Sequence, residues 1–581
     1  MKKIIFSVLL YCISVTICDA QINIRFTNPL ATEIVAGDYN TEDYLPTTVI
    51  DQPVAVIDQM MQETKAANLK DYLIEMQAFN SRNTGSDTLV TGSGIGAARD
   101  WAYKKFESFN EANEDRLIVS YLEFDQNVCG LDKHKNIVAV LPGVGPQHEE
   151  LILIEAHFDS RCRNECDTDC TAMGMEDNAS GSALVLEMAR VMSTMTFNRT
   201  IVFMLTVGEE QGLVGAEALA TYCVANELPV HAVFNNDIVG GVLCGETASP
   251  PGCPSLNNID SINVRLYSAG TLNSPSKSLA RFTKLEYQEN LRDRMPVKPI
   301  INIMSAEDRI GRGGDHIPFR RNGYSAIRFT SANEHGDAGI HADYTDRQHT
   351  QDDILGVDTD GDAVIDSFFV DFNYLQRNAL LNGNAAAMAA MGPITPSLES
   401  LDPVTLGLTV TIDDPNDYNH YRIGLRRTTN DFDTVYTTTE KVTTLTGLDM
   451  NTQWHFVSVA AVDENGVESL FSNERGSFPA SSTDDLISEN KLELLQNQPN
   501  PFDDRTSIGV WVEGSLDYSE ARIEVIKPFG TILYTAPIRL NEGLNEIWYE
   551  HSKHHFAQGI LYYRLVVDGK TMGTKSMVYA Y

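Results

Sequence analysis

The hydrophobic pattern divides the chain into a part where strands and helices alternate and a later part with strands only. Apolar runs typical of buried strands alternate with patterns of helical period, at residues 135–143, 151–159, 180–192, 200–210, 212–226 and 231–240. Amphipathic stretches within residues 54–109 predict helices ahead of these strands. Strands that alternate with helices indicate a mostly parallel sheet with helices on both faces.

The helical pattern stops after residue 391. Residues 394–480 carry short alternating strands separated by turn residues, and residues 493–581 repeat that pattern after a polar connector at 481–492. Residues 21–51 are polar and weakly periodic, which suggests a strap or short propeptide. We therefore predict an α/β fold at residues 52–393, a mostly parallel mixed sheet flanked by helices, followed by two small all-β sandwiches.

The first 20 residues have the pattern of a secretory signal peptide. Two lysines precede a short apolar run, and Ala20 is a small residue suited to a cleavage position. No later segment approaches 18 uninterrupted apolar residues, so we expect no transmembrane segment in the mature chain. The sequence thus predicts an exported protein, secreted or attached to the cell surface.

The charge of the chain argues against polyanionic partners. With 44 Lys and Arg against 80 Asp and Glu, the formal net charge is −36. Such a field repels phosphate backbones and anionic lipid headgroups, so we expect neither nucleic acid nor a membrane surface as a partner. Acidity also suits a protein that gathers metal cations.

Seven of the nine cysteines lie after residue 20, and export permits disulfides. Cys162, Cys166 and Cys170 are open to two interpretations, disulfide bonding or a zinc site, although their spacing matches no standard zinc pattern. Cys244 and Cys253 bracket a small loop that a disulfide could close. An odd count leaves at least one thiol without an intramolecular disulfide.

Acidic and imidazole residues recur where the predicted strands end, and one lies just ahead of a helix: His157, Asp159, Asp177, Glu209, Glu210 and Asp237. Ligands of open α/β sheets bind at the carboxyl ends of the strands, so these groups should converge on one crevice. Clustered carboxylates repel one another unless a cation neutralises them. A mixed set of His, Asp and Glu without thiolates favours zinc.

Six motifs in this region resemble those of the co-catalytic dizinc exopeptidases, a family that includes bacterial leucyl aminopeptidases, glutamate carboxypeptidases and glutaminyl cyclases. They are AHFDS, GMEDNASG, GEEQGLVGA, NNDIVG, GGDHIPF and HTQDD, in the family's order. The resemblance covers residues 54–391 and implies two zinc ions, held by His157, Asp177, Glu210, Asp237 and His349.

The same resemblance implies a role for each site residue. Asp177 would bridge the two ions, and Glu209 would be the general base for the attacking water. Asp159 would orient His157 through its carboxylate. His349 is preferred to His335 and His341 because an acidic residue follows it closely in HTQDD. Asp315 and His316 would support the site without binding metal.

These features predict a secreted zinc aminopeptidase that removes N-terminal residues from extracellular peptides. One alternative keeps the fold but changes the reaction to glutaminyl cyclisation, for which the resemblance implies a single zinc. The other alternative is a non-catalytic surface adhesin that binds through residues 394–480, a segment that resembles a fibronectin type III domain.

Two further features carry predictions of their own. Aspartates alternate in DTDGDAVID, at Asp358, Asp360, Asp362 and Asp366, and predict either a calcium site or an acidic solvated turn. The tail, with LQNQPNPF and GILYYRL, resembles the C-terminal sorting domain of type IX secretion. That resemblance implies the type IX secretion machinery as a partner.

Overall fold

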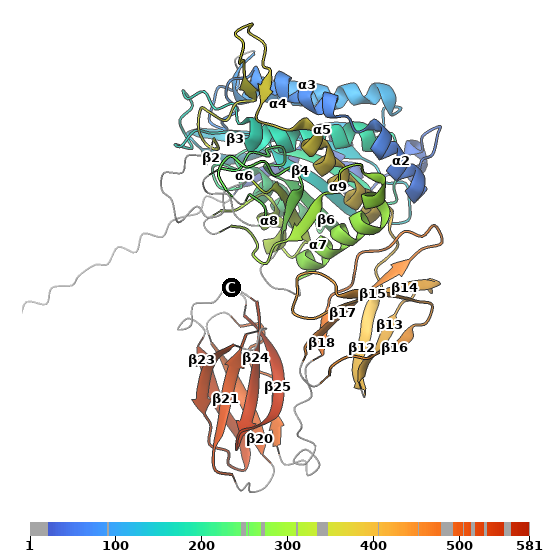
Figure 1. Ribbon diagram of the computed structural model, residues 1–581, viewed down its shortest axis with the longest axis vertical. Helices are drawn as coiled ribbons and strands as arrows, with labels where there is room; N and C mark the ends of the chain where they lie inside the picture. The colour runs from blue at the N-terminus through green and yellow to red at the C-terminus, as the bar shows by residue number, and fades with distance from the viewer. Residues whose placement is uncertain are drawn as a thin grey trace, which may run out of the picture.

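The computed structural model describes residues 21–579, apart from 90–91, 246–250, 254, 269–273, 310–311, 334–346, 405, 451–452, 478–491, 503–504, 513–517, 528–530 and 551–558. The signal-peptide prediction and the rejected ligands His335 and His341 lie outside the described residues. Figure 1 shows an α/β domain followed by two β sandwiches. None of the helices in the described part is long and apolar enough to cross a membrane.

A nine-stranded mixed sheet forms the centre of the α/β domain, in the order β1-β2-β3-β5-β4-β6-β9-β7-β8. Its strands are β1 (Ile22–Phe26), β2 (Ile118–Val128), β3 (Leu131–Leu141), β4 (Leu151–His157), β5 (Thr200–Thr206), β6 (Val230–Asn236), β7 (Asn263–Tyr267), β8 (Ile300–Ile303) and β9 (Ala326–Ser331). The central strands β5, β4, β6 and β9 are parallel to one another. The predicted fold class is confirmed.

Helices cover both faces of this sheet, and every residue of β4 and β5 is therefore buried. The nine α-helices are α1 (Pro29–Val35), α2 (Pro53–Glu63), α3 (Ala66–Gln77), α4 (Gly94–Ser108), α5 (Ser180–Met192), α6 (Val214–Ala225), α7 (Pro275–Glu286), α8 (His316–Arg321) and α9 (Phe372–Met391), counted over the described residues. Alternate residues of β4 enter two different cores: Ile152 and Ile154 pack with α5 and α9, while Leu151 and Leu153 pack with α1 and α6.

The segment expected as a strap or propeptide contributes to the sheet. Its residues Ile22–Phe26 form the edge strand β1, which pairs antiparallel with β2. Asn28 then caps α1 by accepting a hydrogen bond from the backbone of Leu30. The sequence analysis missed this strand, although Ile22, Ile24 and Phe26 alternate with two polar residues; only Phe26 of the five is buried.

Two antiparallel sandwiches follow, each with one three-stranded and one four-stranded sheet. The first contains β12 (Ser397–Val404), β13 (Gly407–Asp413), β14 (His420–Arg426), β15 (Thr434–Thr438), β16 (Val442–Thr446), β17 (His455–Val462) and β18 (Arg475–Ser477). The second contains β19 (Leu492–Leu494), β20 (Arg505–Val512), β21 (Ala521–Ile526), β22 (Ile532–Pro537), β23 (Gly543–Glu550), β24 (Gly559–Val567) and β25 (Lys570–Tyr579). The first sandwich packs against α7 (Figure 1), where Arg281 of α7 reaches Glu474.

Six cysteines form three disulfides: Cys129–Cys166, Cys162–Cys170 and Cys244–Cys253. The pairing of Cys244 with Cys253 follows the prediction. The zinc interpretation of Cys162, Cys166 and Cys170 is wrong, because all three sulfurs are bonded to other cysteines. Cys223 is unpaired and buried in α6, among the described cysteines.

Candidate metal centre

Three parallel strands bring their ends to one place. His157 is the last residue of β4, Asp237 follows directly after β6, and Glu210 lies in the turn between β5 and α6. Because β4 pairs with both β5 and β6 in parallel, their carboxyl ends lie at the same edge of the sheet. The turn that carries Glu210 is held by Asp159, whose carboxylate accepts hydrogen bonds from the backbone N–H of Glu209 and Glu210, both at 3.3 Å.

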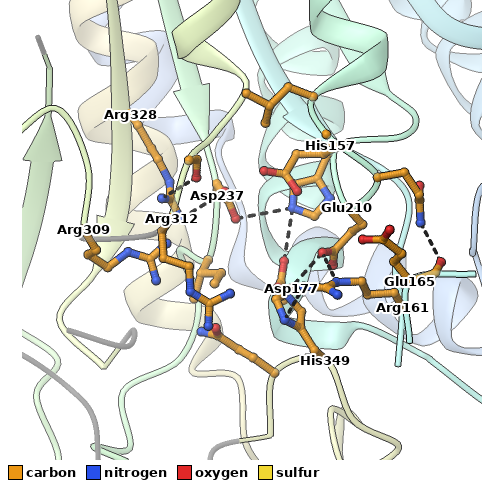
Figure 2. Close-up of a pocket in the computed structure, with 17 residues that line it drawn as sticks. His157, Arg161, Glu165, Asp177, Glu210, Asp237, Arg309, Arg312, Arg328 and His349 are labelled. Atoms are coloured by element: carbon orange, nitrogen blue, oxygen red, sulfur yellow. Dashed lines mark hydrogen bonds and ion pairs between the residues drawn. The ribbon is translucent and has the colours of Figure 1, made fainter. Parts of the chain in front are cut away.

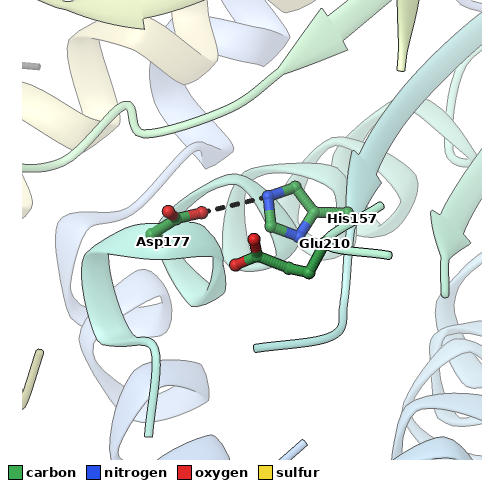
Figure 3. A group of neighbouring side chains, drawn as sticks. All are labelled: His157, Asp177 and Glu210. Atoms are coloured by element: carbon green, nitrogen blue, oxygen red, sulfur yellow. Dashed lines mark ion pairs between the residues drawn. The ribbon is translucent and has the colours of Figure 1, made fainter. Parts of the chain in front are cut away.

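Asp177 lies between two imidazoles. Its Oδ1 is 3.1 Å from Nε2 of His157, and its Oδ2 is 3.0 Å from Nε2 of His349. The turn Met175–Ala179, just before α5, presents this carboxylate. Asp353 holds the turn, since its two oxygens accept the backbone N–H groups of Glu176 and Asp177 at 2.8 and 3.0 Å. Figure 3 shows Asp177 facing His157, with Glu210 beside them.

Two further carboxylates complete two donor clusters that share Asp177. Asp237 Oδ1 lies 3.4 Å from His157 Nε2, and Glu210 Oε2 lies 3.2 Å from His349 Nε2. Ligand atoms about 2.0 Å from one tetrahedral zinc are about 3.3 Å apart. The observed separations therefore match the edges of two coordination shells. His157, Asp177 and Glu210 also form a buried group whose ligand atoms all lie within 4.8 Å of one another.

The electrostatics of the cluster call for a cation. Burial opposes a charge on His157, yet Asp237 and Glu209 outweigh it and raise the pKa of His157 well above its ordinary value. Glu210 Oε1 and Asp237 Oδ1 are buried without a hydrogen-bond partner among the described residues. Buried carboxylate oxygens of this kind are stabilised by metal coordination. The donor set therefore fits two zinc ions.

Glu209 lines the cavity beside the ligands, which has a volume of about 360 Å³. Burial and the charges of Glu210 and Asp237 raise the pKa of the Glu209 carboxyl well above its ordinary value, against the opposing effect of His157. A raised pKa makes a carboxylate a better acceptor for the proton of a neighbouring water. This location suits the base predicted from the sequence.

Asp159 presents two acceptors to Nδ1 of His157, its backbone carbonyl and the carboxylate predicted to orient the imidazole. Nδ1 of His157 is 3.1 Å from the backbone carbonyl oxygen of Asp159 and 3.7 Å from its carboxylate Oδ1. The backbone carbonyl is therefore the nearer acceptor for an N–H on Nδ1, which leaves Nε2 for a metal. The Asp159 carboxylate instead accepts the two backbone N–H groups of the Glu209–Glu210 turn.

Asp315 and His316 lie under the site, fully buried. Burial raises the pKa of Asp315 to about 7, and Thr206 donates a hydrogen bond to its Oδ2. Burial likewise lowers the pKa of His316 to about 4. Neither residue is among the ligand groups described above.

Sequence analysis missed four arginines around the cavity. Arg161 contacts two members of the donor cluster formed by Asp177, Glu210 and His349. Its Nε is 2.6 Å from Glu210 Oε2, and its Nη2 is 2.9 Å from His349 Nδ1. On the side of Asp237, Figure 2 shows Arg309, Arg312 and Arg328. In the sequence, only their closeness to the motifs HFDS and GGDHIPF marks them, and closeness along the chain does not tell where a side chain points.

The acidic turn between β10 (Gly356–Val357) and β11 (Ser367–Phe368) lies at the surface. Ligand atoms of Asp358, Asp360 and Asp366 lie within 4.8 Å of one another, and all three residues are exposed. Asp362 is not part of that group. Asp358 already accepts the backbone N–H groups of Gly361 and Ala363. The calcium site stays a prediction.

Comparison with known proteins gives one family. The sequence model of peptidase family M28 matches residues 136–244, which run from within β3 to beyond β6 and include four of the five predicted ligands. A probable zinc metalloprotease of Leptosphaeria maculans is 31% identical over 366 residues, covering 61% of this chain and 81% of the relative. Another, from Pyricularia oryzae, is 31% identical over 369 residues, covering 61% of this chain and 70% of the relative.

Solved structures resemble the α/β domain more distantly. The LapA aminopeptidase of Legionella pneumophila has a TM-score of 0.42 and 19% identity, covering 60% of this chain and 79% of that protein. A glutaminyl cyclase of Fimbriiglobus ruber has a TM-score of 0.37 and 15% identity, covering 55% of this chain and 95% of that protein. These values are too low to carry a functional conclusion.

The family assignment therefore depends on the sequence matches. They span most of the length of the fungal relatives, and the family model falls on the strands whose ends carry His157, Glu210 and Asp237. The chain belongs to peptidase family M28.

Proposed function

We propose that this protein is an exported zinc exopeptidase that acts as an aminopeptidase on extracellular peptides. The observation that carries the proposal is the position of Asp177 between His157 and His349, 3.1 and 3.0 Å from their Nε2 atoms. A carboxylate shared in this way suits two metal ions in neighbouring positions. Membership of peptidase family M28 and the fungal relatives described as probable zinc metalloproteases support zinc and peptide hydrolysis.

The residues divide into three roles. His157, Asp177 and Asp237 would hold one zinc ion, and Asp177, Glu210 and His349 the other. Bound zinc would supply polarisation of the scissile carbonyl and a lowered pKa for the attacking water. Glu209 would accept the proton of that water on its carboxylate and return it to the leaving amine.

The turn that carries Glu209 is pre-organised for this task. Its backbone N–H and that of Glu210 are both held by Asp159, so a ligand and the base keep a fixed separation. Asp159 thereby acts on both sides of the site, because its carbonyl oxygen lies 3.1 Å from His157 Nδ1.

Export is supported by the three disulfides, which form and persist in oxidising compartments. We further propose that the C-terminal sandwich, β19 to β25, is a sorting domain recognised by the type IX secretion machinery. The motif resemblance of the tail supports this assignment.

Two measurements test the proposed function. Free-amine and N-acetylated fluorogenic peptides separate an aminopeptidase from other exopeptidases, because an aminopeptidase hydrolyses only the free-amine series. Elemental analysis should find about two zinc ions per chain. Glu209→Gln should keep the zinc and lose about two to four decades of kcat, whereas Asp177→Asn should lose zinc. Glu111→Gln, at an exposed surface position, is the matched control and should behave as the wild type.

Several results would contradict the proposal. Normal turnover by Glu209→Gln would remove its role as the base. One zinc per chain, together with conversion of N-terminal glutamine to pyroglutamate, would favour the cyclase instead. Absence of bound zinc in a peptide-binding protein would favour the adhesin.

A further inference from the structure

Arg82 is a fully buried arginine close to the metal centre. It belongs to the segment between α3 and α4, ahead of the residues that the family model matches. Its guanidinium donates hydrogen bonds to three backbone carbonyls: that of Phe158 from Nε at 2.7 Å, that of Gly174 from Nη2 at 2.9 Å, and that of Met173 from Nη1. The side chain is 0% exposed, so it acts on the backbone and out of reach of a substrate.

These three carbonyls lie at the two ends of one loop. The loop leaves the metal centre after His157, at the end of β4, and returns to it in the turn that presents Asp177. Phe158 directly follows His157, and Gly174 lies three residues ahead of Asp177. Arg82 therefore joins the departing strand to the returning turn, beside two ligand atoms, His157 Nε2 and Asp177 Oδ1, that are 3.1 Å apart.

Other contacts draw the same loop ends together. Ser160 Oγ accepts the backbone N–H of Arg82 at 3.1 Å and donates to the carbonyl of Ala172 at 2.6 Å. Gly174 has a φ of +55°, and a Cβ on it would lie 2.5 Å from Ser160 Cβ and would also overlap the carbonyl oxygen of Asp177. The two ends of the loop are therefore in direct contact, so a shift at one end displaces the other.

The two residues after Arg82 hold further parts of the site. Asn83 Nδ2 donates to the carbonyl of Glu165 at 2.8 Å, in the middle of the same loop. Thr84 Oγ1 accepts the backbone N–H of Gly208 at 2.9 Å, directly ahead of the turn that carries the predicted base. Asn83 and Thr84 are at most 2% exposed. Three successive buried residues thus contact the loops on which the ligands lie.

Arg82 also brings a positive charge to an acidic part of the molecule. Burial lowers its pKa to about 10, and the charges of Asp353, Asp159 and Asp177 oppose that fall, so the guanidinium stays charged at neutral pH. Asp353 holds the turn of Asp177, and Asp159 holds the Glu209–Glu210 turn. A cation at this position favours the ionised form of the carboxylates around it.

We propose that Arg82 is a positioning residue of the metal centre, whose guanidinium holds the two ends of the His157–Asp177 loop together and so keeps the shared carboxylate in place for zinc. The inference rests on the proposed function, because it concerns the same zinc site. The planar guanidinium donates in fixed directions, whereas the ammonium of a lysine does not. Residues that orient metal ligands contribute about tenfold to a hundredfold to metal affinity.

The experiment measures the zinc affinity of the full-length protein by competition with a chromogenic chelator. Arg82→Gln should lower that affinity by about tenfold to a hundredfold. Arg82→Lys keeps the charge without the planar fork and should recover only part of the loss. It also supplies the comparison with the wild type if Arg82→Gln does not fold. Peptide hydrolysis by the variants should fall at limiting zinc and recover when zinc is in excess, because every ligand and the base are still present.

Arg116→Gln is the matched control for the loss of a buried arginine. Arg116 is 4% exposed, and its Nη2 donates to the carbonyls of Ser193 and Met195 at 2.5 and 2.9 Å, beyond the end of α5 that lies away from Asp177. Urea unfolding of the zinc-free chains measures the cost of each change to the fold. We expect both glutamine variants to lose stability, and only Arg82→Gln to lose zinc affinity.

The outcomes separate the inference from the proposed function. Wild-type zinc affinity in Arg82→Gln or in Arg82→Lys would overturn the inference, and so would an equal loss of affinity in Arg116→Gln. In each of these cases hydrolysis of free-amine peptides by the wild type would leave the proposed function standing. A loss of zinc affinity confined to the Arg82 variants, in a protein that hydrolyses no peptide, would refute the proposed function alone.

Discussion

The contact between the first β sandwich and α7 depends on one buried carboxylate. Glu474 receives Arg281 Nη1 at 2.9 Å, from α7, and Arg426 Nε at 2.8 Å and Nη2 at 2.5 Å, from β14. The three side chains are at most 1% exposed. Lys277 of α7 is nearby, and burial together with Arg281 and Arg426 lowers its pKa to about 7. Glu474 is thus the buried carboxylate that both guanidinium groups contact directly.

Glu474→Gln keeps the shape of this side chain and removes its charge. Both guanidinium groups would stay buried. One carboxylate oxygen, an acceptor, would be replaced by an amide nitrogen, so a donor would face the N–H donors of the arginines. Breaking a buried ion pair by removing one partner costs about 3–5 kcal/mol, because the remaining charge is left without compensation. We expect a loss of that size in the free energy that holds the sandwich on the α/β domain.

Urea unfolding of the full-length protein measures this loss, and protease cleavage near Gly392 reports release of the sandwich. Glu289→Gln is the matched control across the same interface. Glu289 pairs with Arg422 at 2.7 Å, but its side chain is 44% exposed, so the cost should stay below about 1 kcal/mol. If Glu474→Gln cost no more than the control, the buried network would not be what fixes the sandwich, and our reasoning would be refuted.

Three further predictions concern pH, calcium and export. Burial raises the pKa of Glu286, at the same interface, to about 7. The folded state therefore holds a proton that the unfolded state releases near pH 4.5, so stability should fall by up to about 3 kcal/mol as pH rises from about 4.5 to 7, and Glu286→Gln should flatten that fall. Calorimetric titration of the zinc-loaded protein with calcium should give a saturable heat, and Asp360→Asn should remove it. A titration without that heat would favour the alternative interpretation, an acidic solvated turn. Deletion of residues 492–581 should leave an active enzyme retained inside the cell, whereas normal export of the truncated chain would exclude a sorting role.

The alternation of strands and helices could be predicted because it depends on local burial. β4 and β5 bury all their residues, and they appear in the sequence as continuous apolar runs followed by helical patterns. β1 was missed, because it is too short to give a continuous apolar run. Its residues Ile22, Ile24 and Phe26 do alternate with polar ones, but the run is only five residues long and, at the edge of the sheet, buries one residue in five.

The predicted ligands were accessible to sequence analysis for a related reason. His157 and Asp237 follow apolar runs directly, and parallel strands bring such ends together without further information. His349 follows no strand, and its assignment came from a motif resemblance. The structure places it 3.0 Å from Asp177, across 172 positions of the chain.

By itself, the sequence determined the α/β class and the two appended β sandwiches, because these follow from periodicity. It also predicted the candidate ligands, His157 and Asp237 from the ends of strands and His349 from a motif resemblance. Tertiary structure alone decided which partners those residues have. The carbonyl of Asp159 faces His157 while its carboxylate holds the next turn, and Cys162 pairs with Cys170 rather than with a metal. Arg309 and Arg312 come from a loop and Arg328 comes from β9, so only the folded chain brings these three arginines to one cavity. Contacts of this kind depend on side-chain direction after packing, which the order of residues does not encode locally.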